Sequence, residues 1–324
     1  MPRCLTVALY KFVLLPDFAQ MRPALLATCL DLGVKGTILL AREGVNGTIA
    51  GSPEGVHAVL SRLRTDTRLS DLEHKESWAQ STPFLRMKVR LKAEIVTMQV
   101  PGLDAARDAG TYVKPQDWNA LIAQPDVVVI DTRNNYEVGV GSFEGALNPA
   151  TSSFSELPEW IRKQSEPGGV LACVDGKRPR VAMFCTGGVR CEKSTALLRM
   201  QGFEEVYHLQ GGILKYLEQV PPEQSSWRGE CFVFDERVSV SNGLKPGSLD
   251  LCRSCRRPLS ALDKSSPKYR AGVSCASCFE RTSDEQKKGF AERQRQVELA
   301  RSRNRIHLGV AMPVIEQGVS EDLR

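Results

Sequence analysis

The sequence predicts an α/β chain made of a small α+β domain, a second domain built on a parallel sheet, and a cysteine-rich C-terminal extension. Stretches typical of strands and helices alternate through residues 1–100. Continuous apolar runs, typical of strands buried on both faces of a sheet, begin at Val127. Beyond Pro221, loops and cysteines become frequent. With 324 residues, the chain is long enough for two or three domains that each bury a core.

Residues 1–100 are predicted to form a ferredoxin-like (acylphosphatase-like) α+β domain. Strands are expected at Leu5–Phe12, Gly36–Ala41 and Asn46–Ala50, and in the β-rich stretch Met87–Val100. Helices are expected at Asp17–Leu32, before Gly33, and from Pro53 to Leu63 after the N-cap Ser52. The order β-α-β-β-α-β is that of a ferredoxin-like sandwich.

The rest of the chain divides into four segments. Residues 101–115 carry recurrent Pro and Gly and are expected to be a linker. Residues 116–221 alternate helices with strands, which predicts an α/β domain with a parallel sheet. Residues 222–283 form the cysteine-rich segment, and residues 284–324 are expected to be a basic helical tail. The strands of the α/β domain are expected at Val127–Asp131, Ala146–Asn148, Val181–Phe184 and Val206–Leu209.

The turn after Phe184 carries the strongest chemical signal. Cys185 follows a buried strand and begins a glycine-rich turn into a helix that ends before Gly202. N–H groups and the dipole at a helix N-terminus stabilise an anion, and Arg190 adds a positive charge. A reactive thiolate at Cys185 is therefore predicted, although many cysteines at strand ends are only buried structural residues. The anion-binding loop around it comprises Thr186, Gly187, Gly188, Val189 and Arg190.

Composition restricts the class of protein. The chain is 42% hydrophobic and 25% charged, as ordinary globular proteins are, and no apolar stretch approaches the ~18 residues of a membrane helix. The start Met1–Pro16 is interrupted by Lys11 and lacks a cleavage site, so we expect no secretory signal, no membrane association and a cytoplasmic protein. The net charge of +5 permits a nucleic-acid partner without requiring one.

Four of the ten cysteines have the spacing of metal ligands. Cys252 and Cys255 form one C-x2-C pair, and Cys275 and Cys278 form a second pair after 19 intervening residues. This spacing fits tetrahedral zinc ligation by four thiolates, which leaves no open position and so predicts a structural zinc site. The alternatives are four unliganded thiols or two disulfides.

Three stretches in order resemble the rhodanese-like domain. The family has an early pattern of D-x-R, then E, then G-A-x-N-x-P. Similar residues occur here in Val129–Arg133, Tyr136-Glu137 and Gly145–Pro149, in that order. Cys185–Arg190 resembles its C-x-x-G-x-R active-site loop, and Gly202–Ile213 resembles its closing pattern. The resemblance implies a rhodanese-like fold for residues 116–221, with Cys185 as the catalytic residue.

The resemblance narrows to one subfamily, the tRNA uridine(34) hydroxylases. Ile38–Thr48, Phe184–Thr195 and Phe290–Gln296 are all similar to stretches of these proteins, so the likeness covers nearly the whole chain. It implies oxygen-dependent conversion of the wobble uridine of tRNA to 5-hydroxyuridine, with tRNA as partner, molecular oxygen as co-substrate and no redox cofactor. Protein partners are not indicated. A Cys185 thiolate could attack C6 of the pyrimidine and make C5 nucleophilic.

Three other functions fit parts of the pattern. A rhodanese-type sulfurtransferase would carry a persulfide on Cys185. A cysteine phosphatase would need C-x5-R, whereas Arg190 lies at C-x4-R and Cys191 takes the position that would complete the longer loop. A non-catalytic binding module would have no need of an intact cysteine at residue 185.

Several further residues have both a functional and a structural interpretation. Cys191 is either a resolving thiol for Cys185 or a small residue packed under the loop. Arg133 could contact the substrate at the rim of the pocket, but a structural salt bridge with Asp131 is the favoured interpretation. Glu43 and Asn46 could bind the substrate or serve only the geometry of a hairpin turn.

The C-terminal tail is a candidate contact for the phosphate backbone. Arg281–Arg305 holds eight Lys or Arg and four Asp or Glu. A basic helix here could lie along the phosphates of tRNA, or it could be an ordinary solvated helix. Aromatic residues are few, so base stacking is not expected.

Overall fold

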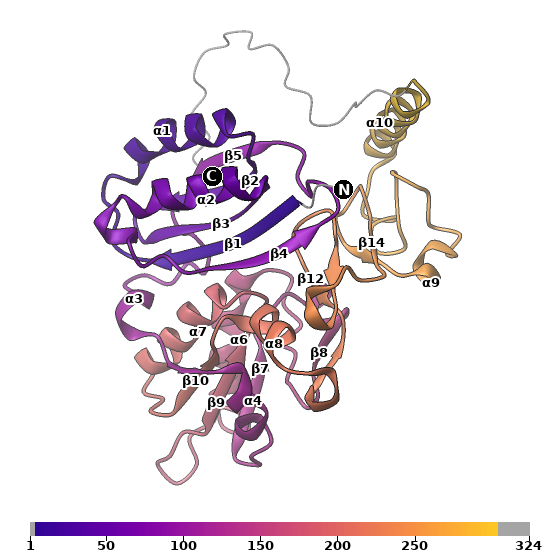
Figure 1. Cartoon of the computed structure of the whole chain (residues 1–324). Helices are drawn as coiled ribbons and strands as arrows, with labels where there is room; N and C mark the ends of the chain where they lie inside the picture. The colour runs from indigo at the N-terminus through magenta and orange to yellow at the C-terminus, as the bar shows by residue number, and fades with distance from the viewer. Residues whose placement is uncertain (1–3, 304–324) are drawn as a thin grey trace.

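The computed structural model describes residues 4–303, and residues 304–324 of the predicted tail lie outside the described part. The N-terminal domain lies above the second domain in Figure 1, and the cysteine-rich region runs along one side of both. Within residues 4–303, no helix combines the length and the apolar character needed to cross a membrane.

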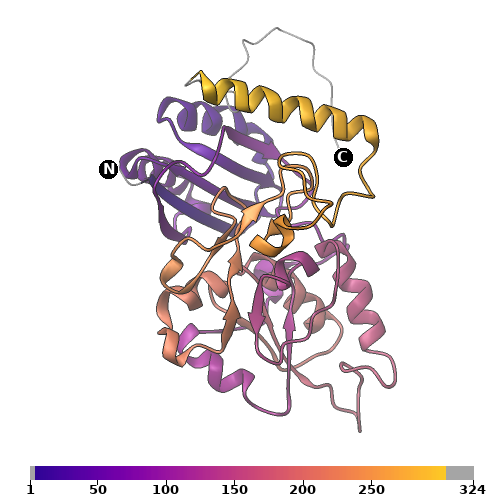
Figure 2. The same ribbon diagram turned by 90° about the vertical axis from the view of Figure 1, so that its right-hand side faces the viewer.

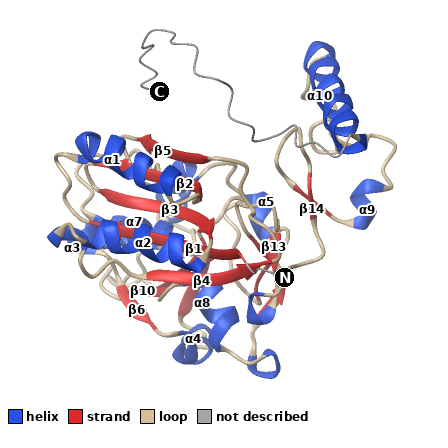
Figure 3. Cartoon of the chain, turned by 45° about the horizontal axis from the view of Figure 1, so that its top comes forward, coloured by secondary structure: helices blue, strands red, loops and turns tan. Residues whose placement is uncertain are grey.

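The N-terminal domain confirms the ferredoxin-like prediction and adds one strand. Its five-stranded sheet has the order β4-β1-β3-β2-β5, with α1 and α2 on one face (Figure 3). The strand that completes the β-α-β-β-α-β order is β4, which the sequence did not predict. The expected stretch Met87–Val100 instead gives the shorter β5, which pairs parallel with β2. The elements are β1 Cys4–Phe12, α1 Phe18–Asp31, β2 Lys35–Ala41, β3 Gly44–Gly51, α2 Pro53–Arg64, β4 His74–Ala79 and β5 Met87–Leu91.

The two faces of this sheet have different chemistry because successive side chains on a strand point to opposite sides. On β1, Leu5, Val7 and Leu9 are buried in a core shared with both helices. The alternate residues Thr6, Ala8 and Tyr10 face a cavity next to the second domain. The sheet therefore presents a largely polar face to the neighbouring domain.

The second domain is built on four parallel strands in the order β6-β10-β9-β7. β6 falls within the segment expected to be a linker, where it pairs with β10. The strand expected at Ala146–Asn148 is wrong, because only a single bridge between Ile130 and Leu147 forms there. The elements are α3 Ala105–Asp108, β6 Thr111–Val113, α4 Pro115–Ile122, β7 Val127–Asp131, α5 Asn135–Val138, β8 Gly141–Phe143, α6 Leu157–Gln164, β9 Arg180–Phe184, α7 Val189–Met200, β10 Val206–Leu209 and α8 Gly212–Gln219.

Helices cover both faces of the parallel sheet. α6 and α7 contribute to one core and α4 and α8 to the other. Residues 181–184 of β9 are fully buried between these layers. This strand is thus enclosed on both faces, as the continuous apolar run predicted.

The cysteine-rich region consists of short hairpins and loops followed by a long helix. Its helix α10 lies beyond the hairpins, at the upper edge of Figure 2. Ser283 caps α10 with a capping box, and no residue of the helix is buried. The elements are β11 Trp227–Gly229, β12 Cys231–Phe232, β13 Ser239–Val240, β14 Asp250–Leu251, β15 Pro258–Leu259, α9 Ala261–Lys264 and α10 Asp284–Ser302.

Candidate active site

Cys185 lies between the carboxyl end of β9 and the first turn of α7. Gly188 is the N-cap of α7, with a φ of 103° that favours glycine. This conformation turns the N–H of Gly188 toward Cys185, where it donates to Sγ at 3.1 Å. The loop therefore forms the anion-binding turn expected from the sequence.

A second helix fixes this loop from behind. The N–H groups of Ile213 and Leu214, at the start of α8, donate to the carbonyl oxygens of Cys185 and Thr186, each at 3.0 Å. The approach is so close that a Cβ on Gly212 would lie 2.5 Å from the carbonyl oxygen of Cys185. The carbonyls of Cys185 and Thr186 are thus bound by α8, while the N–H of Gly188 donates to the thiol.

Arg190 is held by a buried acid. Its guanidinium forms a bidentate pair with Glu137, both nitrogen–oxygen distances being 2.8 Å, and it also contacts the hydroxyl of Thr186 at 3.3 Å. Glu137 has no exposed surface, and the Arg190 charge keeps the pKa of its carboxyl below the ordinary value despite burial. The pair anchors the loop to α5 and keeps a cation beside the cysteine.

Cys185 is the ionised thiol of a buried pair. Burial alone would raise its pKa, but a hydrogen bond from Cys191, the charge of Arg190 and backbone N–H groups together lower the pKa of Cys185. Burial and the neighbouring thiolate raise the pKa of Cys191 well above the ordinary value. Cys191 is therefore a neutral donor to the Cys185 thiolate.

A cavity of about 510 Å³ opens above Cys185, and all three parts of the chain line it. The volume is within the ~300–1,000 Å³ of small-molecule pockets. Its walls are mainly apolar, with a few polar side chains among them. The lining includes Tyr10, Asn46 and Lys75 from the N-terminal domain, Cys185, Thr186, Gly187, Val189 and Arg190 from the second domain, and Phe234, Asp235 and Arg237 from the C-terminal region.

The structure separates the other residues that the sequence singled out. Asn46 lines the cavity, and its Nδ2 donates to the carbonyl of Ile95 at 3.0 Å. Glu43 lies outside the cavity lining, and its carboxylate accepts from the N–H of Ile95 and pairs with Lys193. It therefore joins the two domains.

Arg133 has no exposed surface and does not line the cavity. Its Nη2 lies 2.6 Å from Asp131 Oδ2, and its guanidinium lies over the ring of Trp227, 5.1 Å from the centroid. These contacts support the structural interpretation of Arg133.

Sequence reasoning missed the polar residues that the N-terminal domain contributes. Lys75 Nζ donates to the carbonyl of Gly187 at 2.7 Å, and Tyr10 donates to Glu192 at 3.0 Å. Both come from alternate positions on strands, and no local motif marks them. From the C-terminal region, Arg237 reaches Ser77 at 2.7 Å and is paired with Asp235. Only the packing of distant segments identifies these residues.

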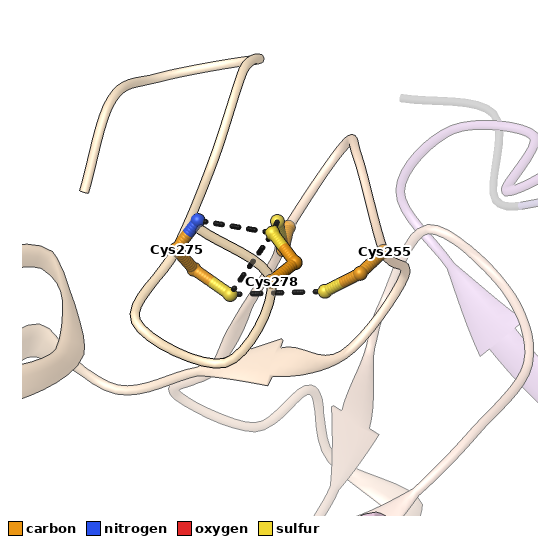
Figure 4. Close-up of side chains that lie close together, drawn as sticks. Cys255, Cys275 and Cys278 are labelled. Atoms are coloured by element: carbon orange, nitrogen blue, oxygen red, sulfur yellow. Dashed lines mark hydrogen bonds between the residues drawn. The ribbon is translucent and has the colours of Figure 1, made fainter. Parts of the chain in front are cut away.

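The four paired cysteines converge at a separate place in the C-terminal region. Their sulfurs lie within 4.8 Å of one another, and all four are free thiols. Figure 4 shows three of them, Cys255, Cys275 and Cys278. The sulfur–sulfur distance is 3.7 Å from Cys275 to both Cys255 and Cys278, and 4.0 Å from Cys252 to Cys278. Four sulfurs around a tetrahedral zinc lie about 3.8 Å apart. The cluster can hold a metal ion, and its distances exceed the ~2 Å of a disulfide.

Comparisons with known proteins match both domains and the whole chain. Residues 4–95 match the UPF0176 acylphosphatase-like domain, and residues 114–219 match the rhodanese-like domain. A protein of Albidiferax ferrireducens named tRNA uridine(34) hydroxylase is 63% identical over 96% of both chains. A protein of the same name from Acaryochloris marina is 59% identical over 95% of this chain and 97% of its own length. Another, from Teredinibacter turnerae, is 54% identical over 94% of this chain and 92% of its own length.

Proposed function

Because this chain belongs to the tRNA uridine(34) hydroxylase family, we propose that it hydroxylates the wobble uridine of tRNA at C5, with molecular oxygen as co-substrate and Cys185 as nucleophile. The observation that carries this proposal is an ionised cysteine at the bottom of a cavity between two domains. The cavity can take one nucleoside but not a helix. tRNA is accordingly the proposed partner.

The proposed first step is attack of the Cys185 thiolate on C6 of uracil. The sulfur–C6 bond forms, the C5–C6 double bond opens, and the electron pair moves toward C5 and O4. C5 then has the nucleophilic character that an electrophilic oxygen species requires. The loop N–H groups and Arg190 keep the thiolate ionised in the free enzyme, so no general base is needed to activate it.

The sulfurtransferase alternative is not favoured. Its support is the loop itself, which could also hold a persulfide on Cys185. The relatives that match over almost their full length are named as hydroxylases.

We propose a structural role for the metal cluster. Four thiolates suit zinc and leave no coordination position for a substrate. Cys252, Cys255, Cys275 and Cys278 would hold the ion. Arg253, between two of these cysteines, pairs with Glu236, which lies between the cavity-lining residues Asp235 and Arg237. The metal would thus fold a wall of the site without taking part in the reaction.

The decisive experiment is a reconstituted reaction. Purified protein is incubated with unmodified tRNA in air or under nitrogen, and the digested nucleosides are analysed by mass spectrometry. We expect 5-hydroxyuridine only in air, only at position 34, and with a mass increase of 2 under ¹⁸O₂ as calculated from the isotope. Thiocyanate release from thiosulfate and cyanide, without tRNA product, would instead support the sulfurtransferase.

A further inference from the structure

Lys75 is the one cation on β4 that reaches the active-site loop from the other domain. Its Nζ donates to the carbonyl oxygen of Gly187 at 2.7 Å and lies 5.3 Å from the centroid of the Tyr10 ring. It lines the cavity together with Cys185. An ammonium group has three N–H donors, and the contact with Gly187 uses one. Among residues 4–303, Lys75 forms no ion pair that would use the others.

A purely structural contact would not need a charged group here. Two other cations at the cavity wall are paired, Arg190 with Glu137 and Arg237 with Asp235, and the remaining one, Lys92, is exposed to solvent. Removing an ammonium group from water is costly unless other groups compensate for the lost hydration. If the hydrogen bond to the Gly187 carbonyl were the whole purpose of this residue, a neutral donor would be enough. An ammonium group kept unpaired beside a thiolate indicates a group that interacts with the contents of the cavity.

The addition step needs a donor at a defined atom. When a thiolate adds to C6, the displaced electron pair moves through C5 and C4 to O4. Negative charge therefore develops at a distance from the sulfur, on the opposite side of the ring. Charge that develops during a reaction is stabilised best by a donor already fixed in place, in a site from which water is excluded.

We propose that Lys75 is a catalytic acid that donates a proton to O4 of the uracil ring as Cys185 Sγ bonds to C6. The inference rests on the proposed function. One sulfur–carbon bond and one oxygen–hydrogen bond form, while the C5–C6 and C4–O4 π bonds give way to a C4–C5 double bond. The thiolate and the ammonium group become a thioether and a neutral amine, so charge is conserved and no oxidant takes part in this step.

The charges around Lys75 suit a proton donor near neutral pH. Burial lowers its pKa to about 8, and Lys215 on α8 acts in the same direction. The Cys185 thiolate, Glu73 and Glu192 act in the opposite direction and favour the ammonium form. Tyr10 stays neutral, because burial and Glu192 raise its pKa well above the ordinary value. The amine is thus protonated at neutral pH and can still release its proton.

The test compares Lys75→Met and Lys75→Arg with a matched control, Lys35→Met. Lys35 lies on β2 of the same sheet, is exposed and does not line the cavity. We measure single-turnover formation of 5-hydroxyuridine from pH 6 to 10, tRNA affinity, and thermal unfolding to confirm folding. The rate of Cys185 alkylation without tRNA measures how the charge at residue 75 affects the ionisation of Cys185, separately from proton donation.

General acid catalysis typically raises a reaction rate by about 10²–10⁴-fold. Both Lys75 variants should therefore lose about 100-fold or more in single-turnover rate. They should still bind tRNA with the wild-type affinity. Arginine keeps the charge but does not release a proton at these pH values. The wild-type rate should fall as the pH rises through about 8, because the ammonium group is lost. That fall should be absent from the residual activity of Lys75→Arg, and Lys35→Met should keep the wild-type rate.

Four results would overturn the role of Lys75. A folded Lys75→Arg variant with the wild-type rate would show that only positive charge matters, and a loss in Lys75→Met confined to tRNA affinity would make it a binding residue. A wild-type protein that forms no 5-hydroxyuridine would refute the proposed function and this role together. An active wild type beside unimpaired variants would refute Lys75 alone.

Discussion

At the scale of single residues, two neighbouring buried thiols have opposite charge states. Cys185 accepts hydrogen bonds from the N–H of Gly188 and from the Cys191 thiol, whereas Cys191 lies beside the hydroxyl of Thr132 at 3.7 Å. One cysteine therefore holds the negative charge and the other holds the proton. This arrangement makes Cys191 a donor in the resting enzyme, and a resolving role would need a separate oxidised state.

Replacing Cys185 by Ser should abolish 5-hydroxyuridine formation and leave the fold intact. A serine hydroxyl remains neutral where the thiol is ionised, so the nucleophile is lost. The measurement is the nucleoside assay on protein whose unfolding curve matches wild type. Substantial product from the folded variant would contradict the assignment of the nucleophile.

Cys191→Ala should shift the alkylation of Cys185 to higher pH. The variant lacks the thiol that donates to the Cys185 thiolate, so the pKa of Cys185 rises and less thiolate is present on the acid side. Cys191→Ser retains a donor and should be milder. The measurement is the iodoacetamide rate as a function of pH. Identical profiles for all three proteins would show that Cys191 only fills space.

At the scale of elements, the site depends on how two helices begin. α7 begins at Gly188 and supplies N–H groups to the thiolate, while α8 begins at Gly212 and binds the loop carbonyls. The two adjacent glycines of the loop have different tasks. A Cβ on Gly188 would lie 2.7 Å from the Tyr10 hydroxyl, whereas one on Gly187 would meet nothing within 4 Å.

Gly188→Ala should therefore impair activity far more than Gly187→Ala. Alanine at a φ of 103° costs about 1–3 kcal/mol and pushes Tyr10 away from Glu192. Gly187 lacks this constraint and is the matched control. Unfolding in urea and the nucleoside assay measure the two effects. Equal activity in both variants would contradict the role of the Gly188 turn.

The small core around the four cysteines should depend on its metal. Its buried members are three of the four thiols and Leu259, so little apolar packing remains without the ion. We expect about one zinc per chain by elemental analysis, lost in Cys278→Ala and kept in Cys173→Ser, which changes an exposed cysteine. Proteolysis should begin in the C-terminal region of Cys278→Ala. Metal-free protein purified without chelator would contradict the zinc site.

At the scale of the whole molecule, the domains are joined by buried charges as well as by the cavity. Lys193 on α7 contacts two acids of the preceding segment, Glu43 and Glu94. Its side chain is only 3% exposed. Removing one partner of such a buried group leaves the others uncompensated. The contact fixes α7, and with it Cys185, against the polar face of the N-terminal sheet.

Deleting residues 284–324 should weaken the salt dependence of tRNA binding. No residue of α10 is buried, and each phosphate neutralised changes the slope of log K against log salt by about 0.7 to 0.9. If three basic residues contact phosphates, the slope should change by about 2 to 3 units, with no change in base selection. Salt titrations of the full-length and truncated proteins against the same tRNA measure this slope. An unchanged slope would make the tail an ordinary solvated helix.

The sequence predicted the apolar strands and the reactive thiol before helix α7. It did not predict the polar side chains, such as Lys75 and Tyr10, that the N-terminal domain brings to the site. β4 was missed because His74–Ala79 lacks apolar alternation: it contributes the polar residues Lys75, Glu76 and Ser77 to the cavity wall. β6 was missed because it has three residues. Lys75 thus lies on an element that periodicity could not identify, and only tertiary packing brings it to Cys185.

The depth of Cys185 has a consequence for the shape of RNA that can react. Cys185 has no exposed surface and lies at the wall of the cavity. A pyrimidine stacked in a helix presents neither C6 nor O4 to such a recess, so the nucleotide must swing out of its stack before chemistry begins. Swinging out costs a few kcal/mol in a duplex and least where the strand is already unpaired. The recess thereby selects loop nucleotides by their freedom to unstack, before any base edge is read.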